Sequence, residues 1–206
     1  STGGAHQKAI DEAKRRMAQA AAVEATYIIA SPPREVADLQ LGGRNYRELL
    51  ELGREFGLKP AMEFLGFVAG VNKVKHAWEV ITVAAHPDST IVLDPFPIFR
   101  GGGEIDDMRG IPGDKIAIFH FNDAPASLPR EQQTDADRVY PGDGILDLRK
   151  MLSILKDAGY HGAISLELFN PNYWKEDARE VARIGLEKVP WFERGIGGGV
   201  CRGARR

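Results

Sequence analysis

Short apolar runs alternate with longer amphipathic segments along most of the chain. Five runs have the length and composition of buried strands, at residues 25–30, 60–65, 90–94, 116–121 and 163–169. Between them, apolar positions recur at helical spacing and predict helices over residues 5–23, 45–56, 71–85, 145–158 and 175–192. Strands that alternate with helices of this length indicate βαβ units, so we expect an α/β fold with a parallel sheet.

Three other segments do not fit this alternation. Residues 95–103 are so rich in Pro and Gly that we expect no regular structure there. Residues 123–144 form a polar connection longer than usual, which makes them a candidate functional loop. Residues 195–206 predict a flexible tail, and residues 1–194 are then a single domain.

Composition narrows the class of protein. The chain has 206 residues, of which 43% are hydrophobic and 27% charged, as in ordinary globular domains. The formal net charge of −2 gives no excess of Lys and Arg for nucleic acid. A single cysteine, Cys201, excludes a disulfide framework within the chain, and no apolar stretch is long enough to span a membrane. We therefore expect a cytoplasmic protein.

The ends of four predicted strands carry chemically active side chains. Glu63, Asp94 and Glu167 lie near the ends of three strands, and His120 lies near the end of a fourth. In parallel α/β folds the ligand site gathers at the carboxyl ends of the strands. Three carboxylates there would repel one another without a cation, and oxygen ligands with one imidazole suit Mn²⁺, Mg²⁺, Co²⁺ or Zn²⁺. The four residues together predict one divalent metal site.

Each residue also has a purely structural interpretation. A strand-end acid often caps the next helix or pairs with a surface Arg, and His120 could be a core histidine bonded to a backbone carbonyl. Asn122 and Asp123 are of the types that shape turns. Three other histidines of the helices and loops are expected at the surface: His76, His86 and His161. We favour the metal site because four such groups coincide at strand ends.

Five segments resemble the xylose isomerase-like TIM-barrel superfamily of sugar phosphate isomerases and epimerases. They are MEFLG (62–66), VLDPF (92–96), FHFND (119–123), DRVYPGDG (137–144) and SLELFNPNY (165–173). The last two are the most specific. The resemblance extends from residue 25 to about residue 191, it is strongest toward inosose isomerases, and it implies a barrel of the (β/α)₈ type.

The resemblance implies roles for individual residues. Four of them would hold one divalent metal: Glu63, Asp94, His120 and Glu167. The implied reaction is isomerisation or epimerisation of a polyhydroxy ketone, a sugar or an inosose, by proton transfer through an enediolate. Glu63 and Glu167 would also act as acid and base. Arg138 would border the substrate, and we take Asp123 as a second substrate-binding candidate.

The chain departs from the superfamily pattern in two ways. A histidine is common three residues after the strand aspartate, where this chain has Pro97, so a group that contacts substrate or relays protons would be missing. A (β/α)₈ barrel takes about 250 residues, and the five predicted strands match the last five of eight. An open sheet leaves unpaired edges, so we expect either a second chain in a homo-oligomer or, preferably, a truncated form of a longer barrel.

Three other functions stay open at this point. The same enolate chemistry can expel a hydroxyl group, as in a dehydratase that acts on 3-dehydroshikimate. An incomplete barrel can also be a non-catalytic interaction protein. A metal-dependent endonuclease rests on fold analogy alone and would need more histidines and a basic groove.

Overall fold

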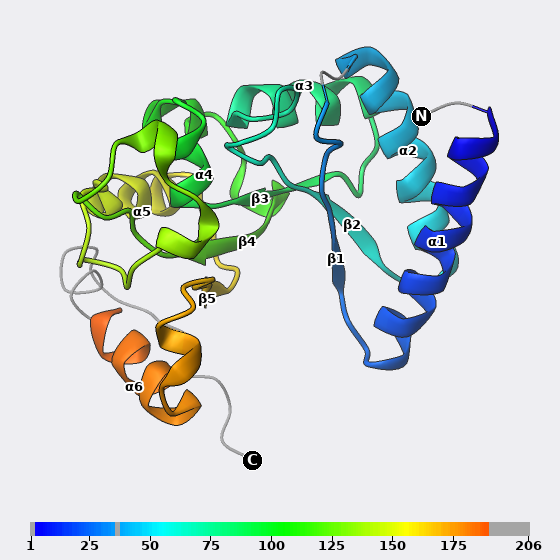
Figure 1. Ribbon diagram of the computed structural model, residues 1–206. Helices are drawn as coiled ribbons and strands as arrows, with labels where there is room; N and C mark the ends of the chain where they lie inside the picture. The colour runs from blue at the N-terminus through cyan, green and yellow to red at the C-terminus, as the bar shows by residue number, and fades with distance from the viewer. Residues whose placement is uncertain (1–2, 36–37, 190–206) are drawn as a thin grey trace.

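Five parallel strands form a curved sheet and follow one another in chain order (Figure 1). The computed structural model describes residues 3–35 and 38–189, so the predicted tail lies outside the described residues. The strands are β1 (Tyr27–Ala30), β2 (Lys59–Met62), β3 (Thr90–Leu93), β4 (Ile116–Phe121) and β5 (Ile164–Leu166). The sheet forms an open half-barrel, which confirms the predicted α/β class and the incomplete barrel.

Helices surround the outer side of this sheet (Figure 1). They are α1 (Gly3–Ala22), α2 (Leu39–Glu55), α3 (Val74–Ala84), α4 (Pro95–Arg100), α5 (Leu148–Asp157) and α6 (Ala178–Lys188). Parallel strands joined in chain order through such helices are the βαβ units that the sequence predicts. In the part of the chain that the structure describes, no helix combines the length and apolar character needed to cross a membrane.

Successive side chains of each strand point alternately into the core and to the inner side of the half-barrel. Phe119 and Phe121 of β4 are completely buried in the main core, which also contains residues of α2, α3 and α5. Because successive strand residues point to opposite faces, His120 points to the inner side. Ala61 and Val92 line an open cavity of about 650 Å³ on that side. Tyr27 and Ile116, which begin β1 and β4, also line this cavity, so it extends to the amino ends of the strands.

Both ends of the sheet are open in the part of the chain that the structure describes. Within the described residues β1 pairs only with β2, and β5 pairs only with β4. Large apolar side chains are exposed at both edges, since Ile29 is 45% and Ile164 is 43% accessible. Open edges of this kind expose backbone N–H and C=O groups to solvent or to other chains.

The structure corrects three predictions. The second helix begins at Leu39 and not at residue 45, because Asp38 caps it by accepting hydrogen bonds from the N–H groups of Gln40 and Leu41. Residues 95–100 form the short helix α4, since a proline is tolerated in a first turn.

The third correction concerns His86, which was expected at the surface. It is buried, and its Nδ1 accepts a hydrogen bond from the N–H of Asp88. The turn at residues 86–89 keeps the imidazole ring buried. The position of His86 in a loop does not reveal this.

Gly43 lies where α2 approaches α3 most tightly. A Cβ at Gly43 would lie 2.3 Å from Cγ1 of Val83, whereas a Cβ at the neighbouring Gly42 would lie 3.5 Å from Cγ2 of Val80. The first distance is a steric overlap and the second an ordinary contact. The packing of these two helices therefore depends on a glycine at position 43.

We predict that Gly43→Ala lowers the free energy of unfolding by about 1–3 kcal/mol, because α2 must move away from Val83. Gly42→Ala should leave stability unchanged or raise it by up to about 1 kcal/mol, since alanine favours helices. Urea unfolding followed by circular dichroism measures both. Equal effects of the two substitutions would contradict the close approach at Gly43.

Candidate metal centre

Three of the four predicted ligands come together at the carboxyl ends of the strands. Asp94 follows β3, His120 lies in β4 and Glu167 follows β5. Their potential ligand atoms all lie within 4.8 Å of one another. The register explains this, because β4 pairs Phe119 with Leu93 on one side and His120 with Ser165 on the other.

His120 supplies an unsatisfied nitrogen to this cluster. Its Nδ1 lies 3.0 Å from Oε2 of Glu167 and 3.5 Å from Oδ2 of Asp94, and it is buried without a well-formed hydrogen bond. Burial by itself lowers the pKa of His120, but the two carboxylates outweigh it and raise that pKa to about 9. A cation, whether a proton or a metal, is thus favoured between these three groups.

The two carboxylate oxygens of Asp94 have different roles: one caps a helix and the other faces the candidate metal site. Oδ1 accepts hydrogen bonds from the N–H of Phe96 (2.9 Å) and from Nδ2 of Asn122 (3.0 Å), so it caps α4. Oδ2 points toward His120 and Arg138. Burial tends to raise the pKa of Asp94, but Arg138 and His120 reverse this and lower it. The helix-cap and metal-ligand interpretations of this residue are therefore compatible.

Glu63, the fourth predicted ligand, lies beside the cluster and not within it. It follows β2, and its Oε2 accepts a hydrogen bond from Oγ of Ser31 at 2.7 Å. Burial raises the pKa of Glu63, and the charges of Asp94 and Glu167 raise it further. Glu63 is therefore near enough to interact with the other carboxylates.

Arg138 brings a buried positive charge to the same place. Its Nη1 donates to Oδ2 of Asp94 at 2.7 Å and to Oε2 of Glu167 at 2.9 Å. The guanidinium carbon lies 5.2 Å from the ring centres of both Phe96 and Phe169. The long loop thus places Arg138 against two of the predicted ligands.

Asp123, the other substrate-binding candidate, organises this loop. Its carboxylate accepts four backbone hydrogen bonds, from the N–H groups of Ala124, Gly142, Gly144 and Leu146. Its backbone also forms an antiparallel bridge with Val139, next to Arg138. Burial raises the pKa of Asp123, against the effect of those N–H donors. This arrangement supports the turn-shaping interpretation and holds Arg138 in position.

Pro97 and two further residues complete the surroundings. Pro97 lies buried in α4 and brings no polar side-chain group to the site. Sequence reasoning missed Ser31, which binds Glu63, and Asp135, which binds Arg138. The spacing of Asp135 three residues before Arg138 is the one signal that would have suggested the latter pair.

The residues fit a divalent metal. The cluster has one buried imidazole nitrogen without a good partner and carboxylate oxygens not engaged by backbone N–H groups, namely Oδ2 of Asp94 and Oε2 of Glu167. This mixed nitrogen and oxygen donor set suits Zn²⁺, Mn²⁺ or Co²⁺, with Mg²⁺ favouring the oxygens.

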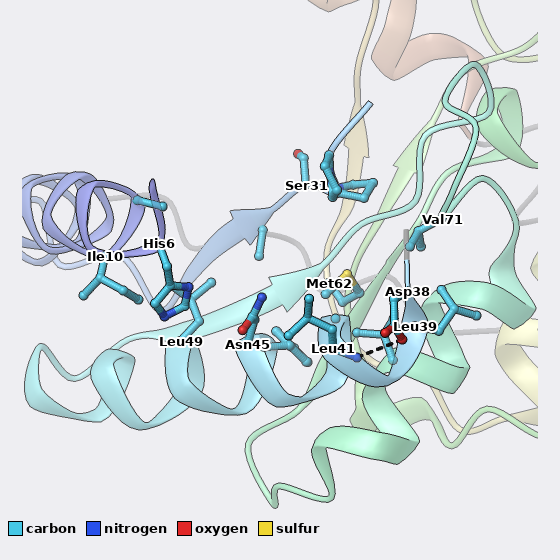
Figure 2. A pocket seen from close by; sticks show the side chains of 17 residues that line it. His6, Ile10, Ser31, Asp38, Leu39, Leu41, Asn45, Leu49, Met62 and Val71 are labelled. Carbon is cyan, nitrogen blue, oxygen red and sulfur yellow. Dashed lines mark hydrogen bonds between the residues drawn. The ribbon is translucent and has the colours of Figure 1, made fainter. Parts of the chain in front are cut away.

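A separate pocket of about 320 Å³ lies between α1, α2 and the end of β1. Figure 2 shows Ile10, Leu41 and Leu49 around it, with His6 and Asn45 among the few polar groups. Ser31 lines this pocket and also donates a hydrogen bond to Glu63, so the pocket lies next to the candidate metal centre. Its mainly apolar lining does not suit a metal or a polyol.

Known proteins resemble the chain over most of its length. The profile of the xylose isomerase-like TIM barrel family matches residues 2–192. An inosose isomerase from Halalkalibacterium halodurans is 38% identical over 141 residues, which are 68% of this chain and 50% of that protein. A 3-dehydroshikimate dehydratase from Pseudomonas putida is 29% identical over 191 residues, which are 91% of this chain and 30% of that protein. These matches confirm the resemblance inferred from the five sequence segments.

A solved structure agrees with the fold and with the metal chemistry. The crystal structure of the IOLI protein with a bound zinc atom aligns with a TM-score of 0.88 and 28% identity, over 97% of this chain and 74% of that one. The chain spans about half the length of the first inosose isomerase above, at 50%. The buried Asp94 and His120 and the partly buried Glu167 are thus able to hold a metal, and a similar protein binds zinc.

We predict that Asp123→Asn lowers the free energy of unfolding by about 1–3 kcal/mol, since the amide –NH₂ would face backbone N–H donors. Asp143→Asn, at an exposed position of the same loop, should change stability by less than about 1 kcal/mol, because it affects only a surface ion pair with Lys188. Thermal unfolding measures both variants. An unchanged stability of Asp123→Asn would exclude the loop-organising role.

Proposed function

The chain belongs to the xylose isomerase-like TIM barrel family, and we propose that it carries the metal site of an isomerase or epimerase acting on a polyhydroxy ketone. The substrate would be a sugar or an inosose. The observation that carries this proposal is the convergence of Asp94, His120 and Glu167 within 4.8 Å at the carboxyl ends of the strands. The similarity to inosose isomerases supports the cyclic ketone.

We assign the metal four ligands, the three converging residues and Glu63. Glu63 joins them if its carboxylate turns from Ser31, and its nearness to Asp94 and Glu167 supports this role. A bound divalent cation would supply the positive charge that stabilises an enediolate. Zinc, manganese, cobalt and magnesium are the candidates.

Glu63 and Glu167 would move the proton. The reaction takes a proton from the carbon beside the carbonyl and returns it to the neighbouring carbon or to the opposite face of the same one. Glu63 is a candidate for this task because burial raises its pKa, which favours uptake of a proton by the carboxylate. Glu167 is only partly buried and would serve as its partner on the other face of the substrate.

Arg138 would bind the substrate from the loop side. Its guanidinium is buried and already lies against Asp94 and Glu167. Asp123, whose oxygens bind four backbone N–H groups, we now assign to positioning the loop, with substrate contact left to Arg138.

A dehydratase is the second candidate. A 3-dehydroshikimate dehydratase matches 91% of this chain at 29% identity, which supports this candidate about as well as inosose isomerases that match 88% at 29–30% identity support the first. Both reactions begin with proton removal beside a carbonyl, so the same residues serve either one. The two reactions differ in the next step: the dehydratase expels a hydroxyl group, whereas the isomerase or epimerase returns a proton to carbon.

Proton NMR in D₂O separates these functions. The chain is loaded with zinc or manganese and mixed with an inosose, with ketoses and with 3-dehydroshikimate. Deuterium incorporation beside the carbonyl with formation of an isomer supports the proposal. New aromatic protons from 3-dehydroshikimate support the dehydratase, and bound metal with no turnover supports a non-catalytic interaction protein.

We predict that His120→Ala weakens zinc binding by more than about 100-fold, because loss of a direct ligand exceeds the 10–100-fold effect of losing an outer partner. His161→Ala, an exposed histidine, is the matched control and should bind zinc normally. Equilibrium dialysis with elemental analysis measures both. If His120→Ala binds zinc as tightly as the unchanged chain, the proposed ligand set is wrong.

A further inference from the structure

The guanidinium of Arg138 engages the same two oxygens that the proposed metal would use. Nη1 lies 2.7 Å from Oδ2 of Asp94 and 2.9 Å from Oε2 of Glu167. His120 Nδ1 faces these two oxygens as well, at 3.5 Å and 3.0 Å. One positively charged group therefore already sits at the position where three ligands converge.

The other half of the guanidinium is held independently. Nη2 and Nε donate to Oδ1 of Asp135 at 2.6 Å and 3.1 Å. The rings of Phe96 and Phe169 lie near the guanidinium, each at 5.2 Å. None of these contacts uses Asp94, His120 or Glu167. The side chain thus has partners that remain when Nη1 gives up the two carboxylates.

We infer that Arg138 is an internal cation that competes with the metal for Asp94 and Glu167 and thereby sets the affinity of the site. The inference rests on the proposed metal site and adds a role for a residue outside the ligand set. Without the metal, Nη1 neutralises two carboxylates that would otherwise repel each other. With the metal, the positive charge of Nη1 repels the metal across the same two oxygens, which weakens metal binding unless Nη1 moves away.

The competition also affects which groups of Arg138 are free to bind a substrate. Asp135 holds the guanidinium at the edge of the centre through Nη2 and Nε, so a small rotation of the planar group about these two bonds is enough to move Nη1 away from the two carboxylates. The donors of Nη1 then become available to an oxygen of the substrate. Metal loading and the availability of Arg138 are therefore coupled through the same two carboxylates.

Zinc affinity of charge variants tests the inference. The variants are Arg138→Gln, which removes the cation, Arg138→Lys, which keeps it, and Arg109→Gln as a control at an exposed ion pair with Asp106. A chromophoric chelator competes with the whole chain for zinc. We expect Arg138→Gln to bind zinc at least about 10-fold more tightly than the unchanged chain, as for loss of one charge-assisted hydrogen bond. Arg138→Lys should bind less tightly than Arg138→Gln, and Arg109→Gln should match the unchanged chain.

Thermal unfolding with and without zinc provides a second readout. Arg138→Gln should be less stable than the unchanged chain without zinc and should gain more in melting temperature when zinc is added. If it unfolds without zinc, zinc should restore its fold. An equal or weaker zinc affinity, or a variant that zinc does not rescue, would overturn the inference and show that Arg138 is only a structural ion-pair partner.

The unchanged chain distinguishes this inference from the proposed function. If it binds zinc while Arg138→Gln binds no more tightly, only the competing role of Arg138 fails. If neither protein binds zinc, manganese or cobalt, the proposed metal site fails and the inference fails with it.

Discussion

The repulsion between carboxylates at one end of the sheet is the constraint on which the site depends. Asp94 and Glu167 are held close together, with Glu63 beside them, where burial reduces the screening by water. Such a group of acids is tolerable only with positive charge among them. His120 and Arg138 supply it here, and the pKa of Asp94 is lowered despite its burial. The chemistry of the site follows from this need for cations.

The sheet creates this constraint by its geometry. Consecutive parallel strands bring residues 94, 120 and 167 to the same edge, and alternation along β4 turns His120 inward while Phe119 and Phe121 anchor the strand in the core. The loop after β4 then returns to the site. Four backbone hydrogen bonds to Asp123 fix that loop, and Arg138 arrives as a consequence. The alternation of side chains along the strands thus produces both the packed core on the outer side of the half-barrel and the charged groups on its inner side.

The sequence was informative where periodicity and strand ends carry the signal. All five strands, the parallel α/β class and the meeting of Asp94, His120 and Glu167 follow from that pattern. The sequence was less informative where a capping side chain determines the residue at which a helix begins. Asp94 starts a helix in a Pro-rich segment, and Asp38 starts another six residues earlier than the apolar pattern suggests.

Side-chain contacts made by loops that fold back over the strand ends could not be predicted from the sequence pattern. The bond from Ser31 to Glu63 joins positions 32 apart, and that from Arg138 to Asp94 joins positions 44 apart. No local spacing encodes such pairs, because they depend on how loops fold back over the strand ends. The resemblance to a known family pointed to Arg138, whereas its competition with the ligands became visible only in three dimensions.

The two open sheet edges have a consequence for association between molecules. The free side of β1 and the free side of β5 differ, so a contact between them joins two copies head to tail. Contacts of this type are heterologous, and successive copies close into a ring or extend into a filament according to the rotation at each junction. Where such an edge-to-edge contact forms, the angle at which one half-barrel meets the next decides between a ring and a filament.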